Sequence, residues 1–204
     1  LEAWRAEAEG AEADGAMPAA RLAGELRRLL EGERWTLVHG TLEGWERRLW
    51  PFERHGQHLG WHGGAGLGYG YGASIGAALA LGRDTLCLNL QADGELLYLP
   101  SALWTAARYR VPVLTVMHNN RQYRNTVEHA QRIASIRGRP GADGREGASL
   151  DDPEVDFASL ARSLGVAGFG PVTAPEELEN AWRAARETVE RGEPALIDVV
   201  TAGA

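Results

Sequence analysis

The chain has 204 residues, of which 44% are hydrophobic and 24% charged, which is ordinary for a globular protein. That length is enough for one large domain with its own hydrophobic core. A net charge of −7, without any basic block, argues against nucleic acid and against an anionic membrane surface as partners.

Two features of the sequence indicate where the protein works. The single cysteine, Cys87, lies inside the apolar run of residues 85–90, so we expect a buried thiol and no disulfide, which fits a reducing cytosol. No apolar stretch approaches the ~20 residues that span a bilayer, and no signal peptide is recognisable. We therefore expect a cytoplasmic protein that does not enter the membrane.

The first seventeen residues differ in composition from the rest of the chain. They are rich in Ala and Glu, so we expect a linker tail over residues 1–17 and a folded domain over residues 18–204. Pro18 then lies near the start of a predicted helix that ends near residue 30. The apolar stripe of this helix consists of Leu22, Leu26, Leu29 and Leu30.

Apolar strands and helices alternate along the rest of the chain. Near-continuous apolar runs predict strands over residues 35–39, 85–90, 111–118, 166–170 and 195–201. Helical patterns predict helices over residues 72–81, 97–109, 153–165 and 174–192. Such an alternation is typical of a parallel sheet that is covered on both faces. We predict one doubly wound α/β domain with a mainly parallel, six-stranded sheet and helices on both faces.

Two segments fall outside this pattern. Residues 41–60 are polar and aromatic, and they predict neither a helix nor a strand. Residues 137–149 are rich in Gly, Arg and Asp and have few apolar side chains. Because ordering a residue costs ~1–2 kcal/mol and this segment could bury little in return, we predict a mobile surface loop there.

Polar residues follow three of the predicted strands. Thr41 follows the first, Asp93 and Gly94 follow the second, and Asn119 and Asn120 follow the third. Ligands of open parallel sheets bind at the carboxyl ends of strands, and a strand, its crossover helix and the next strand form one right-handed unit. We therefore expect Asp93 to lie beside the Asn pair, where carboxylate and amide oxygens suit Mg²⁺ bound together with a phosphate. The alternative is that both motifs are ordinary turns.

Two further patterns leave other kinds of site open. A Gly-x-Gly-x-x-Ala pattern at residues 68–73 fits a dinucleotide-binding fingerprint in form, so a nicotinamide-binding domain is one alternative. However, no apolar strand leads directly into that pattern. Three neighbouring histidines suggest zinc, but they have no nearby cysteine and no helical spacing. These histidines are His55, His58 and His62.

Several motifs agree in order and spacing with one known family. The turn Ala92-Asp93-Gly94 resembles its Gly-Asp-Gly turn, and Asn120 follows Asp93 by 27 residues, the spacing of its Asn-Asn pair. The Gly-rich loop and the closing helices and strands also match. Over residues 18–201 the chain resembles the diphosphate-binding (C-terminal) domain of the thiamine diphosphate-dependent decarboxylase and acetolactate synthase family, in particular benzoylformate decarboxylase-like members.

This resemblance implies a thiamine diphosphate-binding fold, with thiamine diphosphate and Mg²⁺ as cofactors. Asp93, the Asn120 side-chain oxygen and the Gln122 main-chain carbonyl would bind Mg²⁺. Leu67 would hold the cofactor bent, and the Ala65 carbonyl would accept a hydrogen bond from the amino group of its pyrimidine. The other implied cofactor contacts are Thr41, Gly66, Gly94, Glu95 and Tyr123.

Two residues depart from the family pattern. Ala92 stands where the family usually has Gly, and Glu95 stands where many members have a small hydroxyl residue. An acid beside a diphosphate must point away, be protonated or face the substrate. These departures are the sequence support for an alternative, which is a catalytically degenerate subunit with a binding or regulatory role.

The resemblance also implies a partner. In the family a glutamate that activates the cofactor belongs to a pyrimidine-binding domain or subunit, which these residues do not include. The implied function is therefore the diphosphate- and Mg²⁺-binding half of a 2-oxo acid decarboxylase or carboligase, active only within a homo- or hetero-oligomer. Apolar residues expected at the interface are Trp61, Leu67, Tyr69 and Tyr71. Positions expected near the substrate are His118, Thr126, Glu128 and His129.

Overall fold

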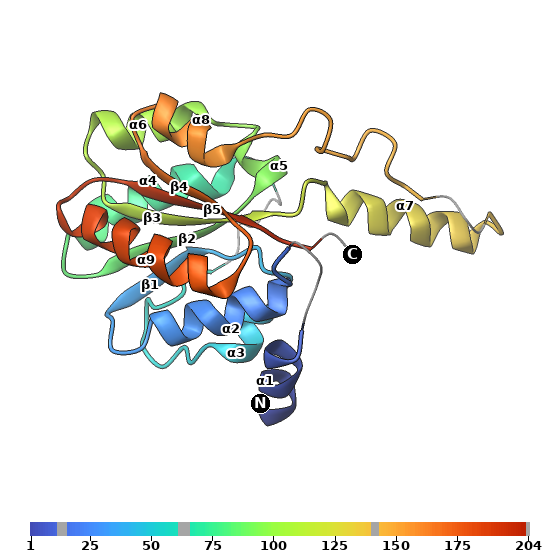
Figure 1. Ribbon diagram of the computed structural model, residues 1–204, viewed down its shortest axis with the longest axis horizontal. Coiled ribbons are helices and arrows are strands. Elements are labelled where there is room, and N and C mark those ends of the chain that lie inside the picture. The colour runs from blue at the N-terminus through green and yellow to red at the C-terminus, as the bar shows by residue number, and fades with distance from the viewer. Residues whose placement is uncertain (12–15, 61–65, 140–142, 203–204) are drawn as a thin grey trace.

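The computed structural model describes residues 1–11, 16–60, 66–139 and 143–202, and a parallel sheet runs through them (Figure 1). The strand order is β1-β2-β3-β5-β4, and every neighbouring pair is parallel. This arrangement confirms the predicted α/β fold with a parallel sheet. The strands are β1 (Trp35–His39), β2 (Leu86–Ala92), β3 (Val113–Asn119), β4 (Ala167–Val172) and β5 (Ala195–Val200).

The sheet has five strands in the described residues, where the sequence predicted six. Residues 41–60, for which the sequence predicts no element, contain the short helix α3 (Trp45–Leu49). They lack the continuous apolar run of a strand that is buried on both faces. Isolated parallel bridges join Leu37 of the edge strand β1 to His58, and Met17 to Thr201 just beyond the end of β5.

Helices cover both faces of the sheet (Figure 1). On one face, α2 (Ala19–Leu29) and α9 (Pro175–Glu190) bury their apolar side chains against the strands. On the other face, α4 (Tyr69–Leu81), α6 (Ser101–Arg108) and α8 (Phe157–Ser163) do the same. Successive strand residues point to opposite faces of the sheet, and each face is covered by one of these two helix layers. The loops at the carboxyl ends of the strands are therefore left to form a site.

Cys87 is buried, as predicted, and burial raises the pKa of its thiol to about 12. The thiol is therefore protonated and unreactive at neutral pH. In the part of the chain that the structure describes, no helix is both long and apolar enough to cross a membrane.

The stretch predicted as a linker contains a helix, α1 (Glu2–Glu9). Its Ala and Glu residues are good helix formers, and Ala8, 3% exposed, joins the hydrophobic cluster that also contains α2. Met17 at the end of the stretch is also buried, and its N–H donates to the Val200 carbonyl at 3.0 Å. The position of the domain boundary stays a prediction.

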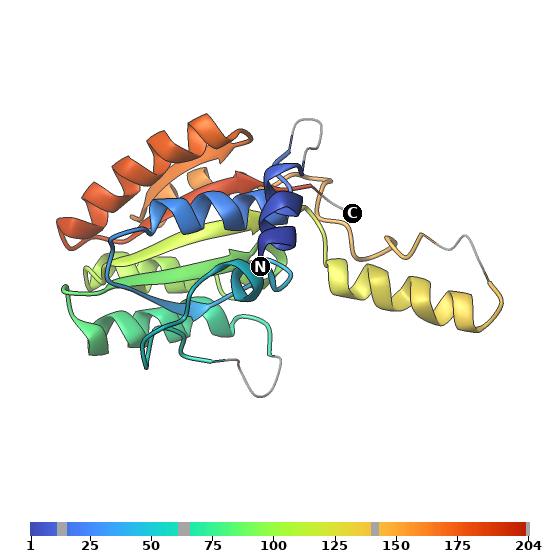
Figure 2. The same cartoon turned by 90° about the horizontal axis from the view of Figure 1, so that it is seen from below.

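Helix α7 (Arg124–Ile136) projects from the body of the molecule (Figure 2). After it the chain returns to the loop that follows β3, where Ala148 is buried and accepts a hydrogen bond from the Tyr123 N–H at 2.8 Å. Ser149 also forms an antiparallel bridge with Gln122. The segment 137–149, whose residues 140–142 lie outside the described part, is thus anchored at its end, and its mobility stays a prediction.

Candidate functional site

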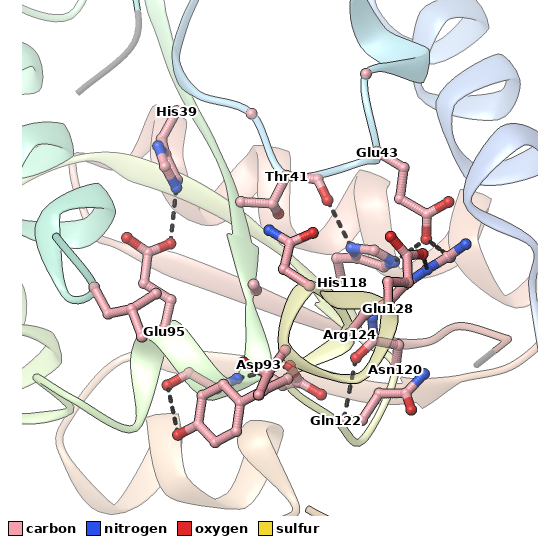
Figure 3. Close-up of a pocket in the computed structure, with 18 of the residues that line it drawn as sticks. His39, Thr41, Glu43, Asp93, Glu95, His118, Asn120, Gln122, Arg124 and Glu128 are labelled. Carbon is pink, nitrogen blue, oxygen red and sulfur yellow. Dashed lines mark hydrogen bonds and ion pairs between the residues drawn. The ribbon is translucent and has the colours of Figure 1, made fainter. Parts of the chain in front are cut away.

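The carboxyl ends of β1, β2 and β3 open onto a cavity of about 740 Å³ (Figure 3). It is lined by the three loops that the sequence singled out, so residues far apart in the chain meet at one edge of the sheet. From these loops the lining includes Thr41, Glu43, Asp93, Gly94, Glu95, Asn120, Gln122 and Tyr123.

Asp93 carries a buried carboxylate that is only partly satisfied. It is 2% exposed, and its Oδ1 accepts a hydrogen bond from the Gly94 N–H at 2.6 Å. Its Oδ2 is buried without a hydrogen-bond partner. Burial raises the pKa of Asp93 to about 6, against the effect of backbone N–H donors. An unsatisfied buried carboxylate oxygen is costly, and a bound cation would satisfy it.

The loop after β3 offers further oxygens. Asn120 Oδ1 accepts a hydrogen bond from the Gln122 N–H at 3.1 Å, across Arg121, whose φ of 58° is left-handed. No group of three or more His, Cys, Asp or Glu side chains able to hold a metal occurs among the described residues. Asp93 would therefore bind a cation together with uncharged oxygen ligands of the protein. The ion would need further ligands from elsewhere, such as a phosphate.

The turn after β2 is shaped by its small residues. Ala92 has φ −72° and ψ 145°, which any residue adopts, so the methyl group that departs from the family pattern does not strain the turn. Gly94 is required by close packing, because a Cβ there would clash with Cε1 of Tyr123. The Tyr123 hydroxyl lies 3.4 Å from the Gly94 carbonyl, so this ring covers the turn.

Glu95 points away from the Asp93 turn, toward His39 (Figure 3). Its Oε2 lies 2.7 Å from His39 Nε2 and 2.9 Å from Gln91 Nε2, and its Oε1 accepts from the Gly70 N–H at 3.1 Å. The acid is 4% exposed. The acid was expected to point away from the diphosphate, to be protonated or to face the substrate, and the structure shows that it points away. The sequence alone did not identify His39 as the partner of Glu95.

Thr41 is held by hydrogen bonds within the protein, and its cofactor contact stays a prediction. Its hydroxyl donates to the Leu90 carbonyl at 3.1 Å, and its own carbonyl lies 2.7 Å from His118 Nδ1. Since a carbonyl can only accept, Nδ1 of His118 carries the proton. His118 Nε2 is buried without a hydrogen-bond partner, 3.7 Å from Glu43 Oε1. Burial lowers the pKa of His118 to about 4, so this ring is neutral at pH 7.

A cluster of charged side chains, centred on Arg124, lines the cavity beside His118. Arg124 forms ion pairs with Glu43 and with Glu128, the latter at 2.7 Å. Burial raises the pKa of Glu43, while Arg124 opposes that shift. Of the positions expected near the substrate, His118, Thr126 and Glu128 line the cavity, while His129 does not belong to its lining.

His118 is expected to make the fold sensitive to acid. Between pH 6.5 and 4 the unfolded chain takes up a proton at this residue that the folded chain does not, so the contribution of His118 to stability falls as pH falls, while the raised pKa of Asp93 acts in the opposite direction. The His118 contribution changes by about 1.4 kcal/mol per pH unit and by roughly 3 kcal/mol down to pH 4. The difference in urea-unfolding stability between wild type and His118→Asn, which keeps a donor for Thr41, should therefore follow this slope, and the exposed control His55→Asn should show no such difference from wild type. Equal slopes in wild type and His118→Asn would contradict the assignment.

The Gly-rich loop lies beside the cavity. Leu67 lines it and is 51% exposed, and a Cβ built on Gly66 would meet nothing within 4 Å, so that backbone is open. Tyr69 is 46% exposed, as expected for an interface, but Tyr71 is 1% exposed and belongs to the core. That expectation was wrong because Tyr71 faces the sheet from α4. Residues named from the sequence that lie outside the described part are Trp61, His62 and Ala65.

A family model agrees with this architecture. The model described as "Thiamine pyrophosphate enzyme, C-terminal TPP binding domain" matches residues 38–199. That range contains β2 to β4, all of β5 except Val200, and all three loops of the cavity.

Known proteins resemble the chain over most of its length. A Mycobacterium tuberculosis protein named as acetolactate synthase large subunit IlvX is 38% identical over 138 residues, 67% of this chain and 25% of that protein. Benzoylformate decarboxylase of Pseudomonas aeruginosa is 36% identical over 136 residues, 67% of this chain and 23% of that protein. The solved thiamine diphosphate-dependent 4-hydroxybenzoylformate decarboxylase of Rhodococcus jostii RHA1 is 25% identical with a TM-score of 0.78, over 95% of this chain and 34% of that one. The chain spans about a quarter of the length of the curated relatives it matches.

Proposed function

Because the chain belongs to the thiamine pyrophosphate enzyme family through its C-terminal TPP binding domain, we propose that it supplies the diphosphate- and Mg²⁺-binding half of a 2-oxo acid decarboxylase or carboligase. One observation carries the proposal. Asp93 Oδ2 is a buried oxygen without a partner, at the edge of the sheet where ligands bind, in a cavity that Asn120 also lines.

The oxygens at this edge suit Mg²⁺. Asp93, the side-chain oxygen of Asn120 and the main-chain carbonyl of Gln122 are the proposed ligands, and all three residues line the cavity. Mg²⁺ prefers six oxygens in octahedral geometry and is commonly bound by one or two carboxylates plus phosphate. With one carboxylate in the set, the ion would bind tightly only together with a diphosphate.

The rest of the cavity suits the cofactor. Its volume of about 740 Å³ lies within the range of small-molecule sites. Gly94, the main chain of Glu95, Tyr123 and the main chain of Thr41 would surround the diphosphate, and Gly66, Leu67 and the Ala65 carbonyl would contact the rings. When bound, thiamine diphosphate supplies a ring carbon that attacks the substrate carbonyl and a ring that takes up the electrons released with CO₂.

An exposed apolar surface beside the cavity supports the proposed partner. Around Leu67, a Cβ built on Gly68 would contact the Cβ atoms of Tyr98 and Leu99, so these side chains are neighbours. Both are large and exposed, at 60% and 41%. Such a surface marks an interface. We propose that a pyrimidine-binding domain or subunit covers it, within a homo- or hetero-oligomer in the cytoplasm.

Leu67 is expected to act on the cofactor's shape rather than on its affinity. Leu67→Ala leaves the metal ligands and the Asp93 turn untouched, so Mg²⁺-dependent affinity for thiamine diphosphate should change less than about threefold. Exchange of the cofactor's C2 proton in the complete assembly should slow by roughly tenfold to a hundredfold, because small misplacements of reacting groups are that costly. Leu79→Ala, at another exposed leucine, is the control. An unchanged exchange rate would show that Leu67 has no such role.

The proposed function is tested by calorimetry on the complete assembly. We expect thiamine diphosphate to bind when Mg²⁺ is present and to be released when it is removed. Absence of binding would favour the alternative of a catalytically degenerate subunit. Ala92 does not support that alternative, because the turn that contains it is unstrained. Binding of NADH without any need for Mg²⁺ would instead indicate a nicotinamide site.

A further inference from the structure

We propose that Glu95 is a positioning residue that holds the loop carrying Leu67 at a set distance from the Asp93 turn. The inference rests on the proposed function, because it assigns those two parts to opposite ends of one cofactor. It also concerns a link within the protein that exists whether or not a ligand is bound.

The link is made by one side chain. Glu95 follows Asp93 by two residues in α5 (Asp93–Leu96), and its Oε1 accepts a hydrogen bond from the Gly70 N–H at 3.1 Å. Gly70 lies in the first turn of α4, three residues after Leu67. The carboxylate therefore ties the start of α4, and the loop that leads into it, to the turn that would hold the metal.

Buried partners keep the carboxylate in place. Its Oε2 lies 2.7 Å from His39 Nε2 and 2.9 Å from Gln91 Nε2, and Gln91 Oε1 in turn accepts from Asn89 Nδ2 at 3.0 Å. Every one of these side chains is 4% exposed or less. Asn89 Oδ1 has no hydrogen-bond partner, but both oxygens of Glu95 are bonded. Moving this carboxylate would leave buried partners unsatisfied, which favours one geometry.

Close packing at Gly70 reinforces the link. A Cβ on Gly70 would lie 2.5 Å from Cδ2 of His39 and 2.8 Å from Oε1 of Gln91, so no side chain fits between α4 and these residues. The His39 ring also meets the Tyr69 ring edge-on, at 6.1 Å between centroids. The start of α4 is therefore held both by a hydrogen bond and by contact with the partners of Glu95.

A shorter residue at position 95 could not make this link. Serine, a small hydroxyl residue of the kind many family members have here, is two bonds shorter than Glu and cannot span from α5 to the Gly70 N–H. Its hydroxyl would stay beside the Asp93 turn. In this chain the Glu95 side chain does not point toward the proposed diphosphate. It joins the Asp93 turn to the loop that carries Leu67 instead.

The experiment compares Glu95→Ser, Glu95→Gln and Gly70→Ala in the complete assembly. Three quantities are measured: amide hydrogen exchange of residues 66–72 without cofactor, affinity for thiamine diphosphate with Mg²⁺, and exchange of the bound cofactor's C2 proton. Glu95→Ser and Gly70→Ala should speed the amide exchange at least about tenfold and slow C2 exchange by roughly tenfold to a hundredfold, with affinity within about threefold. Glu95→Gln keeps an oxygen for the Gly70 N–H and should restore much of both rates. The exposed control Glu187→Ser should match wild type.

Each outcome decides the proposal. Wild-type amide exchange or wild-type C2 exchange in Glu95→Ser would overturn it, and so would equal losses of affinity and C2 rate, which would make Glu95 a diphosphate ligand. Gly70→Ala disturbs the same contact without changing the acid. Urea unfolding shows which of the two variants folds properly, and that variant decides the proposal. If the wild-type assembly binds no thiamine diphosphate, the proposed function fails. The amide exchange then still tests whether Glu95 holds the loop that carries Leu67.

Discussion

Replacing Asp93 or Asn120 by Ala is expected to abolish Mg²⁺-dependent binding of thiamine diphosphate to the complete assembly. Each residue would supply one ligand oxygen, and a cation that demands octahedral geometry tolerates the loss of neither. We expect affinity to fall by more than about a hundredfold, beyond the range seen when residues that merely orient ligands are changed. Calorimetry at saturating Mg²⁺ measures this.

The matched controls are Asp84→Ala and Asn180→Ala, which remove the same groups at exposed positions away from the cavity. Both should bind as the wild type does. Asp93→Asn is informative as well, because it keeps the shape of the side chain but removes its charge, and it should lose affinity like Asp93→Ala. Near-native affinity in either Asp93→Ala or Asn120→Ala would show that the metal is held elsewhere.

The chain alone is expected to show no turnover and not to remain monomeric. The proposed site is half of a complete one, and the surface beside it exposes large apolar groups. These include Leu67, Tyr69, Tyr98 and Leu99. Because contiguous apolar surface of this kind is costly to leave in water, we expect it to be covered by another subunit.

Sedimentation analysis and a CO₂-release assay test this expectation together. Adding a pyrimidine-binding partner, thiamine diphosphate and Mg²⁺ should raise the rate of 2-oxo acid decarboxylation from background to a measurable turnover. A preparation reconstituted with Asp93→Ala provides the inactive control. A stable monomer, or turnover by the 204-residue chain without a partner, would contradict the prediction.

Much of the fold could be predicted from local patterns. The apolar runs placed all five strands, although β2 begins and ends one or two residues later than predicted. The predicted total of six strands was one too high for the described residues, although no sixth segment had been assigned. Residues 41–60, which have no pattern of either kind, contain the helix α3 of only five residues. The segment 1–17 was interpreted from composition as a linker, yet the same Ala and Glu residues favour the helix α1.

The sequence by itself determined the order of the elements, the parallel sheet and the meeting of the loops after β1, β2 and β3, because periodicity and right-handed crossovers follow from the chain's own spacing. Only the tertiary structure decided where the polar side chains of those loops point. Glu95 bonds to His39, 56 residues away, and His118 bonds to the Thr41 carbonyl, 77 residues away. Such partners are chosen by which buried groups need hydrogen bonds once the core has formed, and no local pattern contains that information.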